Sequence, residues 1–140
     1  MKKTKIVLDT NCLLASISSK SENYRVWKGF QQGRFVLCVS NDILEEYEEI
    51  IAKKTNAIVA GNIINAIVES EFVDFIDPQF HFELITNDND DNKFVDCAIA
   101  ANATYIVSED KHFDVLKEIP FPKLLVIGLK DFLQTLMKAE

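Results

Sequence analysis

The sequence predicts an α/β fold with a central, mainly parallel β-sheet of about five strands. Short apolar runs alternate with amphipathic segments along most of the chain, which is typical of strand–helix–strand crossovers. The first run, at 5–9, has no polar alternation, so we expect it to be buried on both faces at the centre of the sheet. The chain has 140 residues and no Gly/Pro-rich linker, which predicts a single domain spanning 1–140.

Residues that cap helices delimit the elements of the first half of the chain. Asp, Thr, Asn and Ser accept hydrogen bonds from the first amides of a helix, and Gly often follows the last turn. Such residues occur at 9–11, at Gly33 and at 40–42. The predicted elements are a strand, two helices, a strand and a long helix, at 5–9, from about Cys12, at 23–32, 35–39 and 41–54.

The second half of the chain continues this alternation. An apolar helix at 56–70 precedes a short apolar run at 72–76, which predicts a third strand. The polar segment 77–91 predicts a loop. The remaining elements are a helix, a strand, a short helix, a strand and a terminal helix, at 92–102, 104–108, after Asp110, at 124–127 and at 130–137.

The net charge of the chain is −7, from 15 basic and 22 acidic residues. Such a balance argues against a nucleic-acid partner, because phosphate binding usually depends on an excess of Lys and Arg. The charge is unevenly distributed, however. Residues 1–34 carry seven basic and two acidic groups, whereas 35–140 carry eight basic and twenty acidic groups. The N-terminal segment therefore remains available to phosphate, and part of the acidic excess is explained if several carboxylates share one metal site.

The cysteines and the N-terminus predict a cytoplasmic protein with no membrane partner. No run of about 18 apolar residues is long enough for a transmembrane helix. The N-terminal Met-Lys-Lys-Thr-Lys leads directly into the first strand, without the features of a signal peptide. Cys12, Cys38 and Cys97 are widely spaced among apolar neighbours, so we interpret them as small buried residues in a reducing compartment.

Acidic residues lie where the predicted strands end, and ligand sites of open α/β sheets form at that edge. Asp9 ends the first strand, and Asp110 comes two residues after the strand at 104–108. Asp91 lies at the start of the helix that precedes the latter strand. Each of these residues alone has a simpler interpretation as a helix cap or a turn residue.

The helix at 41–54 adds a fourth acidic candidate. Its apolar stripe leaves Glu45 and Glu49 on the opposite face, toward water. Glu46 and Glu48 lie on the two flanks, about 100° from the centre of the stripe, so either can turn into a cleft. Carboxylates without accompanying His or Cys suit Mg²⁺ or Mn²⁺, and such a cation relieves their mutual repulsion. Together these residues suggest a metal site that activates water for phosphodiester hydrolysis.

Four acidic motifs follow one another along the chain. They are Lys5-Ile-Val-Leu-Asp9-Thr-Asn11, Ser40-Asn-Asp-Ile-Leu-Glu-Glu46-Tyr, Asp88-Asn-Asp-Asp91-Asn-Lys-Phe and Tyr105-Ile-Val-Ser-Glu-Asp110-Lys-His-Phe. In order and spacing they resemble the PIN domain family, and more narrowly the VapC-like toxins of prokaryotic toxin–antitoxin systems. The resemblance extends from about residue 5 to residue 128. It implies a PIN-like three-layer α/β/α sandwich around the predicted sheet.

The resemblance also implies an activity. Proteins of this type are Mg²⁺- or Mn²⁺-dependent endoribonucleases that hydrolyse single-stranded RNA, and the toxins act with a cognate antitoxin. The family's acidic positions, which supply metal ligands and catalytic groups, correspond here to Asp9, Glu46, Asp91 and Asp110. We therefore expect these four residues to converge on one cleft that holds one or two divalent cations.

Three further residues are implied around that centre. Asn11 corresponds to the residue that supports the first Asp, and Ser108 to the small hydroxyl residue before the last Asp. Asp96 is a marginal additional metal ligand, because it lies about 140° around the helix from Asp91. The sequence departs from the family mildly, with Ser108 where Thr is common and Glu109 adding a charge.

Two weaker signals concern partners. Arg25 and Lys28 alternate with Tyr24 and Trp27, a pattern that can bind RNA through phosphate contacts and base stacking. The simpler interpretation places Trp27 in the core and leaves both cations in water. The apolar helix at 58–68 is wide for a single stripe, which favours a surface for a second copy or an antitoxin.

The residues leave two alternative functions open. One is a PIN-fold module that binds metal or RNA without turnover and acts through a protein partner. The other is a phosphatase with Asp9 as nucleophile, which Asn11 disfavours because an Asp is needed two residues after the nucleophile. We interpret His81 as structural and His112 as a surface residue.

Overall fold

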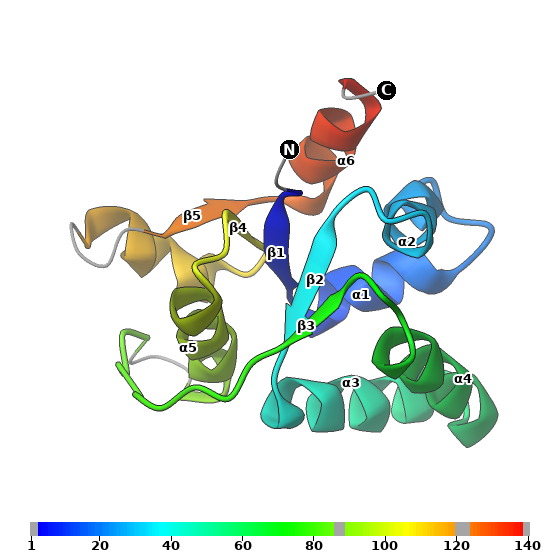
Figure 1. Cartoon of the computed structure of the whole chain (residues 1–140), viewed down its shortest axis with the longest axis horizontal. Helices are drawn as coiled ribbons and strands as arrows, with labels where there is room; N and C mark the ends of the chain where they lie inside the picture. The colour runs from blue at the N-terminus through cyan, green and yellow to red at the C-terminus, as the bar shows by residue number, and fades with distance from the viewer. Residues whose placement is uncertain (1–2, 86–88, 120–123, 139–140) are drawn as a thin grey trace.

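Five parallel strands form a single sheet. The structure, a computed structural model, describes residues 3–85, 89–119 and 124–138. The strand order is β3-β2-β1-β4-β5, with β1 at the centre (Figure 1). The strands are β1 (Lys5–Leu8), β2 (Val36–Val39), β3 (Val73–Phe75), β4 (Tyr105–Val107) and β5 (Leu125–Ile127). The predicted parallel α/β sheet of five strands is confirmed, including the central position of the first strand.

Helices cover both faces of the sheet, as the predicted three-layer sandwich requires. Figure 1 shows α5 on one side and α1, α2 and α6 on the other. The α-helices are α1 (Thr10–Ile17), α2 (Tyr24–Gln31), α3 (Asn41–Lys54), α4 (Ala57–Val68), α5 (Asn92–Ala101) and α6 (Leu129–Lys138). Two 3₁₀ helices are η1 (Asn89–Asp91) and η2 (Lys111–Glu118). Among the described residues, none of these helices combines the length and apolar character that crossing a membrane requires.

The central strands are buried on both faces because each face meets a helix layer. Leu8 of β1 and Leu37 of β2 line a small apolar cavity together with Trp27 of α2. On the other face, Cys38 of β2 lies near Cys97 of α5. Strands that are buried on both faces need apolar side chains at successive positions, because a polar side chain there would be buried without a partner. Trp27 belongs to the core, as the simpler interpretation of its helix predicted.

Side-chain caps mark the starts of α3 and α4. The side chain of Ser40 accepts from the amide of Ile43 at the start of α3, and Asn56 accepts from Val59 at the start of α4. The first helix starts at Thr10, two residues earlier than predicted, because Asp9 is extended and serves as its N-cap position. The short helix after Asp110 has 3₁₀ geometry, a form common in short connecting pieces. The described part of the predicted loop contains η1, while residues 86–88, and with them Asp88, lie outside the described ranges.

The three cysteines are buried and free. Burial raises the pKa of Cys12 and of Cys38 to about 12. It raises the pKa of Cys97 as well. The thiols therefore stay protonated at neutral pH and pack as small apolar groups, in line with their predicted role.

Gly33, which follows α2, provides a test of this packing. Its φ is +74°, and a Cβ there would lie 2.4 Å from Cζ of Phe72. We expect Gly33→Ala to lower the free energy of unfolding by about 2–3 kcal/mol, through backbone strain and displacement of the Phe72 ring. Urea denaturation measures the change. Gly61→Ala is the control, because a Cβ at Gly61 meets nothing within 4 Å and Ala favours a helix by up to about 1 kcal/mol. Equal stability of Gly33→Ala and wild type would contradict the prediction.

Candidate metal centre at the carboxyl edge of the sheet

Several candidate residues lie where the chain leaves β1 and β4. From β1 the chain continues to β2 and β3 on one side, whereas β4 and β5 lie on the other side of β1. Helices therefore diverge at the carboxyl ends of β1 and β4, and such a switch point leaves a crevice in parallel sheets. Asp9 directly follows β1, and Ser108 to Asp110 directly follow β4.

Asp9 is only 6% exposed. It is held in place by Val107, the last residue of β4, and by Ser108, which follows β4. Its amide donates to the carbonyl of Val107 (3.0 Å), and its Oδ2 accepts from the hydroxyl of Ser108 (2.8 Å). Burial raises the pKa of Asp9, and repulsion from Asp110 and Glu46 adds to this rise although the Ser108 hydrogen bond opposes it. The carboxylate makes no capping hydrogen bond to α1, so its position is not explained by helix capping.

Ser108 links Asp9 to Asp110. Its Oγ donates to Asp9 and accepts from the amide of Asp110 at 2.9 Å. The Asp110 carboxylate in turn accepts from the amide of His112 at 2.9 Å, so Asp110 does cap η2. This chain of hydrogen bonds connects two acidic residues that follow adjacent strands.

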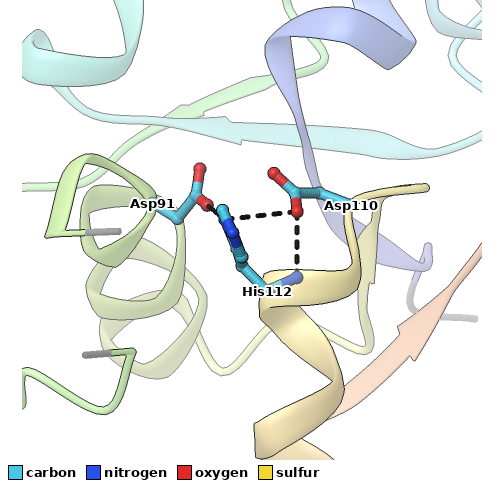
Figure 2. Close-up of side chains that lie close together, drawn as sticks. All are labelled: Asp91, Asp110 and His112. Atoms are coloured by element: carbon cyan, nitrogen blue, oxygen red, sulfur yellow. Dashed lines mark hydrogen bonds and ion pairs between the residues drawn. The ribbon is translucent and has the colours of Figure 1, made fainter. Parts of the chain in front are cut away.

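His112 lies between two carboxylates, a role that the sequence did not reveal. Figure 2 shows its imidazole between Asp91, at the start of α5, and Asp110. The Nδ1 atom lies 3.1 Å from Oδ2 of Asp91 and 3.3 Å from Oδ1 of Asp110. One donor atom from each of the three residues lies within 4.8 Å of the others, as metal binding requires. The sequence contained one indication of this contact. His112 comes two residues after Asp110, whose carboxylate accepts from the His112 amide.

Glu46 reaches the same edge from α3. The buried Tyr47 hydroxyl donates to the carbonyl of Leu8 and fixes the helix beside the end of β1. The neighbouring Glu46 is half-buried and accepts through Oε2 from the hydroxyl of Thr10, while its Oε1 pairs with Lys93 of α5 at 2.8 Å. Of the two flanking glutamates, Glu46 turns inward and Glu48 is exposed.

Asp96 contacts a different set of atoms. Its Oδ1 accepts from the amide of Phe82 (3.1 Å), and its Oδ2 lies 3.2 Å from Nδ1 of His81. One turn earlier, the Asn92 side chain bonds both the amide and the carbonyl of Ile85. Asp96 and Asn92 thus anchor the segment before η1 to α5, and a ligand role for Asp96 remains a prediction.

The structure also gives the positions of Asn11, which was predicted to support Asp9, and of Glu109. Asn11 is exposed, whereas the adjacent Thr10 hydroxyl contacts Glu46. The additional charge of Glu109 has a structural explanation, because its carboxylate accepts from the amide of Leu129 at the start of α6 (2.6 Å). A Cβ at Gly128 would lie 2.7 Å from that carboxylate, so glycine permits the approach.

Arg25 and Lys28 lie away from this centre, on α2 and beside α6. They line a separate cavity of about 310 Å³. Figure 1 places α2 and α6 toward the amino end of β1, opposite to the edge that carries Asp9. Arg25 contacts Sδ of Met137 at 3.4 Å, and the ammonium of Lys28 lies 5.9 Å from the ring centre of Tyr24. Their predicted contact with RNA stays a prediction.

The carboxylates of the donor set fit a hard divalent cation. Asp91 and Asp110 provide the oxygen ligands that Mg²⁺ and Mn²⁺ prefer. The sequence predicts carboxylates without an accompanying His, and the structure differs because His112 lies in the same group. The raised pKa of Asp9 is a second sign of fit, since it reflects burial and carboxylate repulsion that a cation would offset. Next to this centre, a cavity of about 680 Å³ opens between α3 and α5, lined in part by Glu46 and Lys93.

Solved structures with the same fold include toxin–antitoxin proteins. VapBC2 from Rickettsia felis, bound to a promoter DNA fragment, has a TM-score of 0.62 at 20% identity, covering 89% of this chain and 98% of that chain. DNA-bound VapBC from Salmonella typhimurium has a TM-score of 0.59 at 16% identity, with 90% and 98% covered. Mycobacterium tuberculosis VapC20, a sarcin–ricin loop cleaving toxin, has a TM-score of 0.57 at 15% identity, with 78% and 92% covered.

The sequence itself assigns the family. A comparison with curated proteins finds no match. Residues 5–112, however, match the PIN domain family, and this segment contains β1 to β4 and all the acidic residues of the candidate centre. The chain therefore belongs to the PIN domain family.

Proposed function

We propose that the protein is a metal-dependent endoribonuclease that hydrolyses phosphodiester bonds of single-stranded RNA. The observation that carries this proposal is the group of donor atoms from Asp91, Asp110 and His112, together with the buried Asp9, which is close enough to Asp110 for their charges to repel. Buried or half-buried carboxylates that repel one another are unfavourable for folding, so their retention at a switch point favours a catalytic cation. Membership of the PIN domain family supports the same conclusion.

The proposed roles combine the acidic positions of the PIN domain family with the contacts of each residue. We assign Asp9, Glu46, Asp91 and Asp110 as ligands of Mg²⁺ or Mn²⁺, with His112 beside them. When bound, such a cation lowers the pKa of water and offsets charge on the leaving oxygen. The Ser108 hydroxyl keeps Asp9 oriented, and the Asp110 carboxylate caps η2, the helix that carries His112.

The biological role that we propose is the toxin of a toxin–antitoxin pair acting in the cytoplasm. The similar VapBC structures and the VapC20 toxin support it. A cognate antitoxin or a second copy of the chain would bind the apolar surface of α4. Ile58 is 76% exposed there and Val68 is 44% exposed.

Cleavage of labelled single-stranded RNA tests the proposed activity. We expect cleavage by the wild type with Mg²⁺ or Mn²⁺ and none after EDTA treatment. Glu46→Gln should lower the rate at least about tenfold, because it removes a charge near the proposed cation. Glu48→Gln is the matched control, since it makes the same change on the exposed flank of α3 and should leave the rate unchanged.

Two outcomes would contradict the proposal. Activity that survives EDTA would exclude a metal-dependent mechanism. Uptake of Mn²⁺ by the wild type without cleavage of any RNA tested would instead favour a catalytically silent module that acts through a partner.

A further inference from the structure

Lys93 pairs with Glu46 across the space between α5 and α3. The Nζ atom lies 2.8 Å from Oε1, and the two side chains are 21% and 22% exposed. The pair is therefore largely shielded from solvent, so its electrostatic interaction is stronger than that of a surface ion pair. Residues 47 positions apart in sequence form it, so it connects two of the elements that carry the candidate centre.

Both oxygens of Glu46 are engaged in this arrangement. Oε1 accepts from Lys93, and Oε2 accepts from the hydroxyl of Thr10. A divalent cation on Glu46 must displace one of these partners or share the carboxylate with it. Thr10 is neutral and its hydroxyl can turn, whereas an ammonium beside a divalent cation is repelled. Electrostatics therefore selects Lys93 as the group that leaves.

The cavity between α3 and α5 leaves room for that movement. It has a volume of about 680 Å³ and is lined by Lys93 together with Glu49, Glu83 and Asp90. A lysine ammonium on a flexible four-carbon stem can swing into such a space without movement of its helix. The carboxylates that line the cavity would attract the ammonium once it leaves Glu46.

We propose that Lys93 is the internal counter-ion of the carboxylate centre and that a divalent cation binding at Glu46 displaces its ammonium. This inference rests on the proposed function, because it concerns the loading of the same centre. In the absence of the cation, Lys93 offsets the charge of Glu46. On loading, one cation exchanges for another, and the net charge of the centre changes by less than the charge of the incoming ion.

Calorimetric titration of the full chain with Mn²⁺ tests the exchange. We expect Lys93→Met to bind Mn²⁺ about tenfold more tightly than wild type, because no ammonium has to be displaced. Lys53→Met is the matched control. It removes the same charge from an ion pair with Glu49 on α3 (3.1 Å) whose side chains are 66% and 62% exposed, and its affinity should stay within about twofold of wild type. Equal or weaker binding by Lys93→Met than by Lys53→Met would overturn the proposal.

A second measurement follows the lysine directly in the wild-type protein. The ¹⁵N resonance of Lys93 Nζ, assigned by its absence in Lys93→Met, should shift on titration with Mg²⁺ and saturate with the binding isotherm. The Lys53 resonance should not shift. A Lys93 resonance that stays constant through saturation would show that the ion pair persists, and would overturn the exchange whatever the behaviour of the variant.

The outcomes separate this inference from the proposed nuclease. Displacement of the Lys93 ammonium by a divalent cation without RNA cleavage would support the proposed role of Lys93 and overturn the proposed nuclease activity. Metal-dependent cleavage with unchanged Mn²⁺ affinity in Lys93→Met would support the nuclease and overturn the counter-ion. A wild-type protein that binds neither Mg²⁺ nor Mn²⁺ would overturn both.

Discussion

Asp9→Asn is expected to lower metal-dependent RNA cleavage by roughly 100- to 1,000-fold. The substitution keeps the shape of the side chain and its acceptor for the Ser108 hydroxyl, but it removes the charge at the end of β1. A neutral amide binds Mg²⁺ or Mn²⁺ more weakly than a carboxylate does. Single-turnover cleavage with saturating metal measures the loss. Activity equal to wild type would exclude Asp9 from the centre.

The same variant should be more stable than the wild type when metal is removed. Because burial and the neighbouring carboxylates raise the pKa of Asp9 in the folded protein, its ionisation favours the unfolded chain. This penalty is absent below the usual Asp pKa of 3.8 and grows as the pH rises through the raised pKa. We therefore expect Asp9→Asn to have a higher melting temperature than the wild type in EDTA at pH 8.

Thermal melts at pH 4.5 and pH 8 check the sign of this effect. The difference between Asp9→Asn and wild type should shrink as the pH falls toward the usual Asp pKa, because the penalty for ionising Asp9 in the folded protein decreases. Addition of Mn²⁺ should stabilise the wild type more than the variant, since only the wild type has the carboxylate. A variant that is less stable than the wild type at both pH values would contradict the electrostatic origin of the raised pKa.

Asp110→Asn is expected to weaken Mn²⁺ binding by more than about tenfold. Asp110 belongs to the group of donor atoms within 4.8 Å, together with Asp91 and His112. An Asn can still accept the His112 amide as a helix cap, so η2 should remain folded and the loss should reflect the missing charge. Calorimetry at pH 7.5 measures the affinity, and far-ultraviolet circular dichroism verifies the fold.

Asp96→Asn is the matched control for this prediction. Its carboxylate bonds the amide of Phe82 and faces His81, and an Asn oxygen can replace the first of these contacts. We therefore expect Mn²⁺ affinity within about twofold of wild type. A loss as large as that of Asp110→Asn would assign Asp96 to the metal ligands and make its interpretation as an anchor wrong.

The order of the elements could be predicted because local patterns determine it. The apolar run at 6–8 is buried between two helix layers, as its lack of polar alternation predicts, and it lies at the centre of the sheet. Ser40 caps α3 and Asn56 caps α4 through contacts three residues away. Such contacts are visible in the sequence because both partners lie within one turn of each other.

The partners of the acidic residues could not be predicted in this way. Ser108 and Asp9 lie 99 positions apart in sequence, and their contact depends on the pairing of β1 with β4. In the sequence, Glu109 appears only as an additional charge, and the partners of Asp96 cannot be identified there. Their contacts depend on the elements that pack against them: Glu109 contacts the start of α6, and Asp96 contacts the amide of Phe82.

The sequence by itself determined that this is a parallel α/β protein of the PIN domain type with acidic residues at its strand ends. Periodicity and capping act over a few residues, so they can be identified without coordinates. Only the tertiary structure decided that His112 joins Asp91 and Asp110, and that Lys93 neutralises Glu46. The physical reason is that electrostatic interactions depend on distance in space and on burial, and strand pairing and helix packing set both.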